Sequence, residues 1–198
     1  MKIDFHLREY GKNYFSELFS LSSISMLAML TAIQVILSRF FSLETTFIKI
    51  GLGFLPVMVA GGLFGAGGGM IVGGLSDFVG AMLFPFGAYF PGYTITAAFS
   101  GFVYGLFFYK EAGMLKIVMA YVITTITVTL GANSVFQVLL YMKGNASFIV
   151  KYLGLLPGRI IQSLIMLCFQ IALTEYCLND VHILYRINRA RVTGKHRQ

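Results

Sequence analysis

Long apolar runs, separated by short polar or turn-forming segments, dominate the chain. Residues 18–38, 117–142 and 152–178 form three such runs, each at least as long as the roughly 20 residues that a helix needs to cross a bilayer. Strands of a membrane barrel would instead alternate apolar and polar side chains. Because hydrocarbon offers the backbone no hydrogen bonds, unbroken runs of this length predict transmembrane helices.

The middle of the chain is one extended apolar stretch. Residues 50–109 contain a single charged side chain, Asp77, and a helix of that length would measure roughly 90 Å, or about three crossings. Two clusters of turn-forming residues interrupt it, the glycine-rich segment 65–69 and the proline-containing segment 84–92. Three further helices are therefore predicted, near residues 53–64, 70–84 and 92–109.

The composition is typical of a protein embedded in lipid. Hydrophobic residues make up 57% of the 198 positions, charged residues make up 12%, and the mean hydropathy is +0.78. The sequence predicts an all-α integral membrane protein of six transmembrane helices. Its predicted parts are an N-terminal segment (1–17), one membrane domain (18–178) and a basic tail (179–198). The mixed charges of the first segment do not resemble a cleavable signal peptide.

The distribution of Lys and Arg indicates the orientation. In a six-helix topology ten of the fifteen basic residues fall on one side of the membrane. They are Lys2, Arg8, Lys12, Lys110, Lys116, Arg186, Arg189, Arg191, Lys195 and Arg197. Because cytoplasmic loops are enriched in Lys and Arg, both termini are predicted to be cytoplasmic. The net charge of +7 is thus a topology signal, and nucleic acid is not expected as a partner.

This topology places seven hydrogen-bonding side chains of four helices in the outer half of the membrane. They are Gln34, Arg39, Asp77, Asn133, Gln137, Arg159 and Gln162. A charge near the bilayer centre costs about 2.5 to 3.5 kcal/mol on insertion scales, so each one requires a partner or a function. The convergence predicts an outward-facing cavity for a small polar molecule. Asp77 would accept hydrogen bonds from this molecule, and the arginines would form bidentate hydrogen bonds with its carboxylates.

A purely structural explanation is also open for these residues. Arg39 and Arg159 can extend to the outer interface, where Asp77 would pair with one of them. Asn133 and Gln137 can equally bond a neighbouring helix.

Two loops lie on the outer side with the predicted cavity. The segment 84–92 is a candidate lid, in which Tyr89 and Phe90 would stack on a flat ligand. Aromatic residues are also ordinary anchors at the membrane interface, which is the alternative explanation. The segment 41–51, which joins the first two helices, is a candidate second gate.

Small residues recur at helical spacing. Glycines occupy positions 61, 65, 69 and 73, and Gly101 and Gly105 repeat this spacing. Such residues let membrane helices approach closely, so a role in packing is predicted. Ala28 and Ala32 form another small pair, for which spacing alone indicates no more than packing.

The motifs of several other classes of protein are absent. All three histidines lie in the predicted tails, so neither a His-based nucleophile nor a His-based metal site is expected within the membrane. There is no Walker motif for ATP hydrolysis and no evident inverted repeat of a secondary transporter. We therefore expect a protein that is not an enzyme and that uses no cofactor.

Several segments resemble the folate-specific S component, the substrate-binding subunit of energy-coupling-factor (ECF) transporters. They are GLGFLPV (51–57), GGLSDFVG (73–80), LFPFGAYFPGYT (83–94), GFVYGLFFY (101–109), LLPGRII (155–161) and LIM (164–166). The stretch 89–94 is the most specific of them. The resemblance covers roughly residues 27–171.

The resemblance implies six helices that bind one vitamin at the outer side of the bacterial cell membrane. It also implies docking on a transmembrane scaffold subunit that carries two ATPases, with delivery by toppling in the bilayer. Ala28 and Ala32 match the pair that contacts the scaffold in this family. Asp77 and Arg159 lie in matching segments and inherit candidate ligand roles, whereas the other site residues rest on the arguments given above.

Folate suits such a cavity, because Asp77 could accept the donor pair of its pterin and an arginine could bind its glutamate. Three alternatives stay open. The same fold could bind thiamine, riboflavin or pantothenate. A membrane-embedded enzyme could use Asp77 and Glu175, although the predicted depths of the two carboxylates differ. A structural membrane scaffold would bind no ligand.

Overall fold

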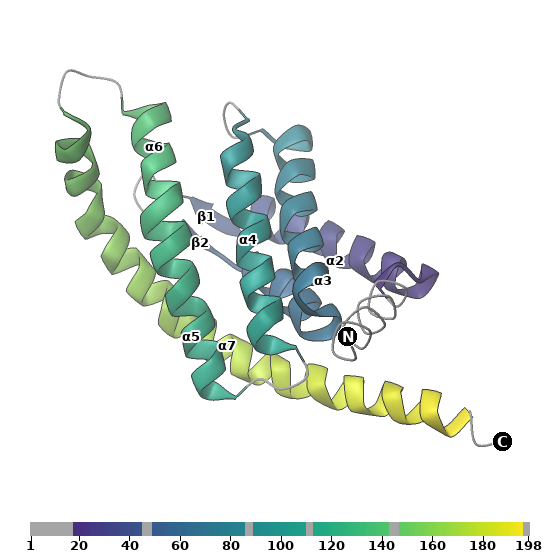
Figure 1. Cartoon of the computed structure of the whole chain (residues 1–198). Coiled ribbons are helices and arrows are strands. Elements are labelled where there is room, and N and C mark those ends of the chain that lie inside the picture. The colour runs from purple at the N-terminus through teal and green to yellow at the C-terminus, as the bar shows by residue number, and fades with distance from the viewer. Residues whose placement is uncertain (1–17, 45–48, 86–88, 110–112, 143–146, 196–198) are drawn as a thin grey trace, which may run out of the picture.

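The computed structural model describes residues 18–44, 49–85, 89–109, 113–142 and 147–195. The predicted N-terminal segment, 1–17, and the tip of the predicted lid, 86–88, lie outside these residues. The described chain is helical apart from two short strands, which the sequence did not reveal (Figure 1). In chain order the elements are α2 (Leu21–Phe40), β1 (Ser42–Glu44), β2 (Lys49–Gly51), α3 (Phe54–Leu83), α4 (Pro91–Phe108), α5 (Met114–Thr124), the π-helix η1 (Thr125–Asn133), α6 (Ser134–Tyr141) and α7 (Phe148–Lys195).

Four helical stretches of the described chain are long and apolar enough to cross a membrane. They are Leu21–Phe40, Phe54–Leu83, Met114–Leu140 and Phe148–Cys177. Three of them correspond to the predicted helices over 18–38, 117–142 and 152–178. The two spans predicted over 53–64 and 70–84 both fall within α3.

α3 is bent sharply at Gly65. This residue has φ 68° and ψ −161°, a combination that essentially only glycine adopts. Gly61 and Gly69 would lie roughly 12 Å apart in a straight helix, yet a Cβ atom on Gly69 would be 3.3 Å from the Cα atom of Gly61. The helix therefore folds back on itself, with arms over 54–64 and 66–83. The break that the sequence predicts in this glycine-rich segment is confirmed, and it lies at the first glycine.

Glycines bring α3 and α4 into backbone contact. A Cβ atom on Gly61 would lie 2.8 Å from the amide nitrogen of Gly105, and one on Gly69 would lie 2.9 Å from the carbonyl carbon of Gly101. Side chains at these positions would push the helices apart, which is why small residues favour close packing in membranes. The packing role predicted for the two glycine series is confirmed.

The fifth predicted helix contains a π-helical segment that the sequence did not reveal. α5, η1 and α6 follow one another without a break from residue 114 to residue 141. In a π-helix the hydrogen bond spans five residues, and such segments often mark functional sites. The hydroxyl of Ser134 donates to the carbonyl of Thr129, five residues earlier, at 2.8 Å.

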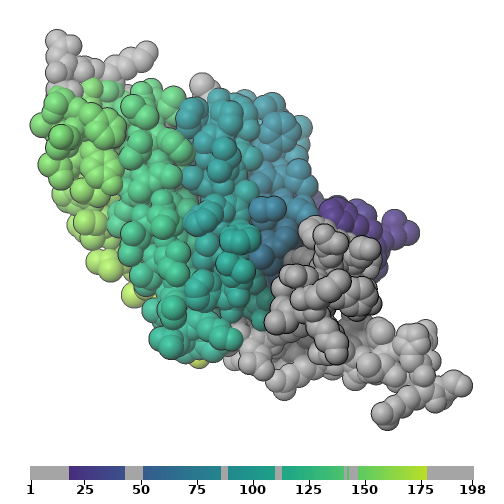
Figure 2. Space-filling view, viewed as in Figure 1, coloured from purple at the N-terminus to yellow at the C-terminus, as the bar shows by residue number. Residues whose placement is uncertain are grey.

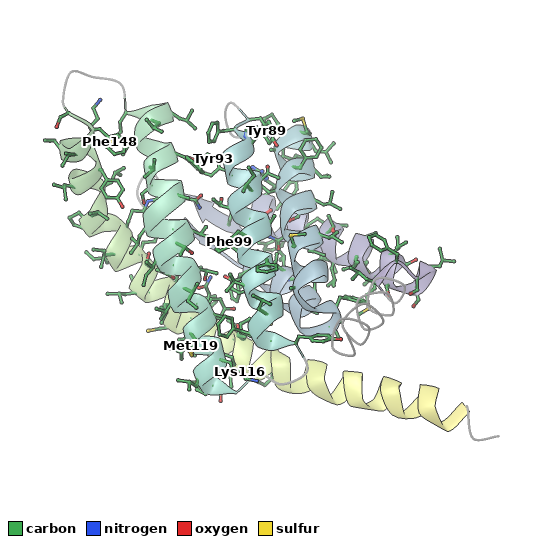
Figure 3. All side chains as sticks on the ribbon, in the orientation of Figure 1. Tyr89, Tyr93, Phe99, Lys116, Met119 and Phe148 are labelled. Atoms are coloured by element: carbon green, nitrogen blue, oxygen red, sulfur yellow. The ribbon has the colours of Figure 1, made fainter. Side chains whose placement is uncertain are left out.

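The helices α4 to α7 form one side of the molecule. Figure 2 shows α4, the α5–α6 helix and α7 side by side on the face nearest the viewer. Tyr89 and Tyr93 lie at one end of this array and Lys116 lies at the opposite end (Figure 3). Between α3, α4 and α5 the side chains of Met58, Phe108 and Tyr121 are fully buried. This core holds the helices that surround the candidate site.

α2 begins and ends at residues that suit helix termini. Ser20 precedes it and its hydroxyl accepts a hydrogen bond from the amide of Ser23 at 3.3 Å, which caps the first turn. Arg39 lies in the last turn. β1 and β2 then pair in antiparallel register, with Ser42 opposite Gly51. The predicted second gate therefore contains a small hairpin.

Candidate functional site

A cavity of about 350 Å³ lies between α2, α3, α4, η1 and α7. Six of the nine predicted ligand-binding residues line it, namely Gln34, Arg39, Asp77, Asn133, Arg159 and Gln162. The volume lies in the range of small-molecule sites, which is roughly 300 to 1,000 Å³. The structure thus brings these six side chains together, and their contact with a ligand stays a prediction.

Asp77 is linked to the end of the predicted lid through Thr94. The hydroxyl of Thr94 donates to Oδ2 of Asp77 at 2.8 Å, and the hydroxyl of Tyr89 lies 3.1 Å from the same Thr94 oxygen. Because Thr94 has one proton and gives it to the carboxylate, Tyr89 is the donor in the second bond. The Asp77 carboxylate is therefore oriented through its Oδ2 atom, and its Oδ1 atom can accept a further hydrogen bond.

Arg39 reaches α3 one turn beyond Asp77. A Cβ atom on Gly80 would lie 2.9 Å from Nε of Arg39 and 3.2 Å from one of its terminal nitrogens. Residues three apart share a helix face, so the guanidinium group and the Asp77 carboxylate occupy the same side of α3. Both line the cavity.

Asn133 ends the π-helix and is oriented by α4. The hydroxyl of Thr96 lies 2.9 Å from Oδ1 of Asn133 and 2.9 Å from the carbonyl oxygen of Tyr93. The hydroxyl of Thr96 has one proton, which it shares between these two acceptors. With Oδ1 of Asn133 turned to Thr96, the amide nitrogen of Asn133 is the atom that can donate to a ligand.

Arg159 has a neutral partner. Its guanidinium group donates to Oε1 of Gln137, a residue that does not line the cavity. A bond to a neighbouring helix is the alternative that the sequence left open for Gln137, and its predicted contact with a ligand stays a prediction. A guanidinium group that is held by an amide keeps its positive charge uncompensated at that contact, so it can form a bidentate pair with a ligand carboxylate.

The rings of Tyr89 and Phe90 pack against aromatic rings of α3 and α6, and neither residue lines the cavity. Tyr89 meets Phe78 edge to face with ring centroids 5.9 Å apart, and Phe90 meets Phe136 in the same way at 5.0 Å. Tyr93 completes the second cluster, with its centroid 5.7 Å from that of Phe136. The predicted stacking of Tyr89 and Phe90 on a ligand is not tested by these contacts and stays a prediction.

Sequence reasoning missed most of the hydroxyl groups that line the cavity. They are Ser38, Ser42, Ser76, Ser100, Tyr104, Thr125, Thr129 and Ser163, to which the amide of Gln170 is added. A signal was present in the spacing, because Thr125, Thr129 and Asn133 recur every four residues and so share a face. Reading polar positions by helical face, and not only by charge, would have found several of them.

Aromatic side chains close the inner part of the site. Tyr104 lines the cavity, and its ring packs against Phe108 at 5.6 Å and Tyr121 at 5.1 Å between centroids. The hydroxyl of Tyr121 is bonded to that of Thr174 on α7. The buried rings thus separate the cavity from the end of the helices where Lys116 lies (Figure 3).

The two predicted partner-binding alanines lie on the surface of α2. Ala28 and Ala32 are both exposed, whereas Leu27 and Val35 of the same helix are buried. In Figure 1 α2 extends away from the array of α4 to α7. The face with the alanine pair is therefore accessible to another protein or to lipid.

Comparison with known proteins identifies several relatives. A family model described as the S component of an ECF-type riboflavin transporter matches residues 18–177. The folate transporter FolT of Clostridium novyi (strain NT) is 40% identical over 111 residues, which are 56% of this chain and 64% of that protein. FolT of Leuconostoc mesenteroides subsp. mesenteroides is 27% identical over 157 residues, which are 78% of this chain and 83% of that protein.

A solved structure has the same fold. The crystal structure of FolT bound with folic acid superposes with a TM-score of 0.72 at 33% identity, over 81% of this chain and 94% of that chain. The match to the Clostridium protein spans just under two thirds of that protein's length.

These relatives are transport proteins, which confirms the expectations that the chain is not an enzyme and that it is a multi-pass protein of the cell membrane. The family model covers 160 of the 198 residues, from 18 to 177. The chain therefore belongs to the S-component family of ECF-type transporters.

Proposed function

We propose that this chain is the substrate-binding subunit that captures folate at the outer face of the cell membrane. The observation that carries the proposal is a single cavity that holds the carboxylate of Asp77 and the guanidinium groups of Arg39 and Arg159. Two relatives named as folate transporters and a FolT structure bound with folic acid support folate as the ligand.

The chemistry of folate matches the charged groups of the cavity, which are the carboxylate of Asp77 and the guanidinium groups of Arg39 and Arg159. A pterin presents two adjacent N–H donors, which would pair with the two oxygens of the Asp77 carboxylate. Oδ2 accepts from Thr94 and keeps a second lone pair for this purpose, and Oδ1 accepts the other N–H group. The glutamate of folate carries two carboxylates, and the planar guanidinium group of Arg159 can form a bidentate pair with one of them. In this arrangement Asn133 donates to the ligand from η1.

Riboflavin is the alternative ligand, because the matching family model is described as a riboflavin transporter component. Riboflavin carries no carboxylate, so it would leave the guanidinium group of Arg159 without an anionic partner in a partly buried site. A buried charge without a partner is unfavourable. The presence of Arg159 therefore favours folate.

The proposed topology has six crossings with both termini in the cytoplasm. The hairpin form of α3 supports it, because each arm then counts as one span and α4 supplies the next. The separation of Tyr89 and Lys116 at opposite ends of the helices agrees with an outer aromatic end and an inner basic end (Figure 3).

Delivery is proposed to need an ECF module with a transmembrane scaffold and two ATPases. The exposed pair Ala28 and Ala32 would be the contact with the scaffold, because small side chains let two helices approach closely. Replacing both by Trp should prevent copurification with the scaffold. Leu106→Trp, at an exposed position of α4, is the control, and copurification of the double variant would refute the assignment.

The first experiment is calorimetric titration of the detergent-purified chain with folate, and with riboflavin, thiamine and pantothenate as comparators. One-to-one binding of folate alone is expected. Binding of riboflavin alone would keep the family and change the substrate, and no binding of any of the four would contradict the proposal.

Variants of two acidic residues localise the pterin. Asp77→Asn is expected to weaken folate binding by roughly ten-fold or more, since a hydrogen bond to a charged group contributes about 1.5 to 3 kcal/mol. Glu175→Gln is the matched control, because Glu175 is exposed and does not line the cavity. Equal affinities of Asp77→Asn and the parent would show that the pterin is not bound there.

A further inference from the structure

Two polar side-chain atoms at the cavity have no hydrogen-bond partner. Among the buried side-chain atoms of the described residues, these are Oε1 of Gln34 and Oγ of Ser163. Both residues line the cavity, and Ser163 is only 8% exposed. Burying a hydroxyl group without a partner is unfavourable, so such a group in a binding cavity indicates a bond that the ligand completes.

Ser163 differs from the other serines of the same cavity. Ser76 is buried to a similar degree, with 4% exposure, and its hydroxyl donates to the carbonyl of Gly73 at 3.1 Å. Ser100 donates to the carbonyl of Thr96 at 2.9 Å. Helical serines usually satisfy themselves on their own backbone in this way. The Ser163 hydroxyl does not, and so it retains its proton for another acceptor.

The position of Ser163 indicates which part of a ligand it meets. It lies four residues after Arg159 on α7, which is one turn and roughly 6 Å along the helix. Both side chains line the cavity. In folate, the amide that joins the glutamate to the rest of the molecule lies next to the α-carboxylate. With the carboxylate on Arg159, this amide comes within reach of the next turn of the helix.

We propose that Ser163 donates a hydrogen bond to the carbonyl oxygen of a ligand amide that adjoins the carboxylate bound by Arg159. Ser163 then determines specificity for ligands in which an amino acid is acylated, as in folate. Gln34 Oε1, on α2, is an acceptor and takes an N–H group of the same ligand. This inference rests on folate binding as proposed above.

The primary test compares two buried serines by calorimetric titration with folate. Ser163→Ala is expected to raise Kd about five-fold, the effect of one neutral hydrogen bond. Ser134→Ala, which removes a buried hydroxyl that is bonded to the backbone and does not line the cavity, is expected to leave Kd within two-fold of the parent. The melting temperature of unliganded Ser163→Ala should not fall, because the hydroxyl makes no bond in the unliganded protein.

A second test identifies the ligand atom. Folate and an analogue with a thioamide in place of the amide, whose sulfur is a poor acceptor, are titrated into the parent and into Ser163→Ala. The analogue is expected to bind the parent about five-fold more weakly than folate, and to bind Ser163→Ala no more weakly than folate does.

The outcomes separate this inference from the proposed function. If the parent does not bind folate, the proposed function fails. If the parent binds folate and Ser163→Ala binds it equally well, the inference fails and the proposed function stands. In the second test, a contrary result is that the substitution Ser163→Ala and the thioamide each weaken binding by the same factor whether or not the other change is present. This result would show that Ser163 contacts another part of the ligand, and it would overturn the amide assignment.

Discussion

The guanidinium group of Arg39 lies on the bare backbone of Gly80, where a Cβ atom would come within 2.9 Å of Nε. The absence of a side chain at Gly80 lets the last turn of α2 place a cation against α3, one turn beyond Asp77. Close approach of helices normally depends on small residues. Here a small residue also makes room for a charged group in the cavity.

Gly80→Ala is therefore expected to displace Arg39 and to weaken folate binding by about ten-fold, the scale of a lost bond to a charged group. The variant should still fold, because only the long and flexible side chain of Arg39 has to move. Calorimetric titration measures the effect. Gly154→Ala is the control, because a Cβ atom there meets nothing within 4 Å. An unchanged Kd for Gly80→Ala would show that the position of Arg39 does not matter for binding.

Thr94→Val should weaken folate binding by roughly five-fold, because Val keeps the shape of Thr but leaves Oδ2 of Asp77 without its donor. Thr94→Ser should restore the affinity, since it keeps the hydroxyl. Tyr89→Phe acts one bond further away and should have a smaller effect. Calorimetric titration of the three variants gives the order of their affinities for folate. A loss of affinity in Thr94→Ser as large as in Thr94→Val would refute a role for the hydroxyl.

Gly65→Ala is expected to destabilise the protein by about 1 to 3 kcal/mol, because Gly65 has backbone angles that other residues rarely adopt. Thermal unfolding in detergent, followed by circular dichroism, measures this effect. Gly154→Ala serves again as the control and should be neutral or slightly stabilising. A Gly65→Ala protein as stable as the parent would contradict the hairpin form of α3.

The topology can be tested with single cysteines in a background of Cys168→Ser and Cys177→Ser. Ser147→Cys, between α6 and α7, should react with a membrane-impermeant maleimide on intact cells. Gly113→Cys, between α4 and α5, should react only after permeabilisation, because that loop is proposed to be cytoplasmic. Both positions are exposed. Labelling of both or of neither on intact cells would rule out the six-span orientation.

The sequence allowed good predictions where a strong physical constraint acts on many residues together. Apolar runs over 18–38, 117–142 and 152–178 predicted helices, because hydrocarbon leaves the backbone no alternative. Charges and amides are costly in lipid, so Asp77 and Arg159 could be assigned to one cavity before the structure placed them there.

Prediction was weakest where single residues decide the outcome. Ser and Thr can satisfy themselves on the helix backbone, so neither Thr94 nor Ser163 differs from a packing residue by its type. The strands β1 and β2 have three residues each and carry no periodic signal. The π-helix η1 depends on the packing around residues 125–133, which hydropathy does not report.

Gln137 illustrates a related limit. Its depth in the membrane predicts either a bond to a ligand or a bond to a neighbouring helix, and depth alone cannot separate these two roles. The structure places Gln137 on Arg159, outside the cavity lining.

The neutral partner of Arg159 also affects how fast an anionic ligand arrives. A carboxylate partner would cancel the positive potential of the guanidinium group, whereas the amide of Gln137 leaves that potential in place at the cavity. Charged clefts with low-dielectric walls concentrate the field and accelerate the association of ligands of opposite charge. Added salt screens exposed charges more than buried ones. The association rate of a dianionic ligand would therefore fall with ionic strength, while its dissociation rate, governed by contacts inside the cavity, would change little.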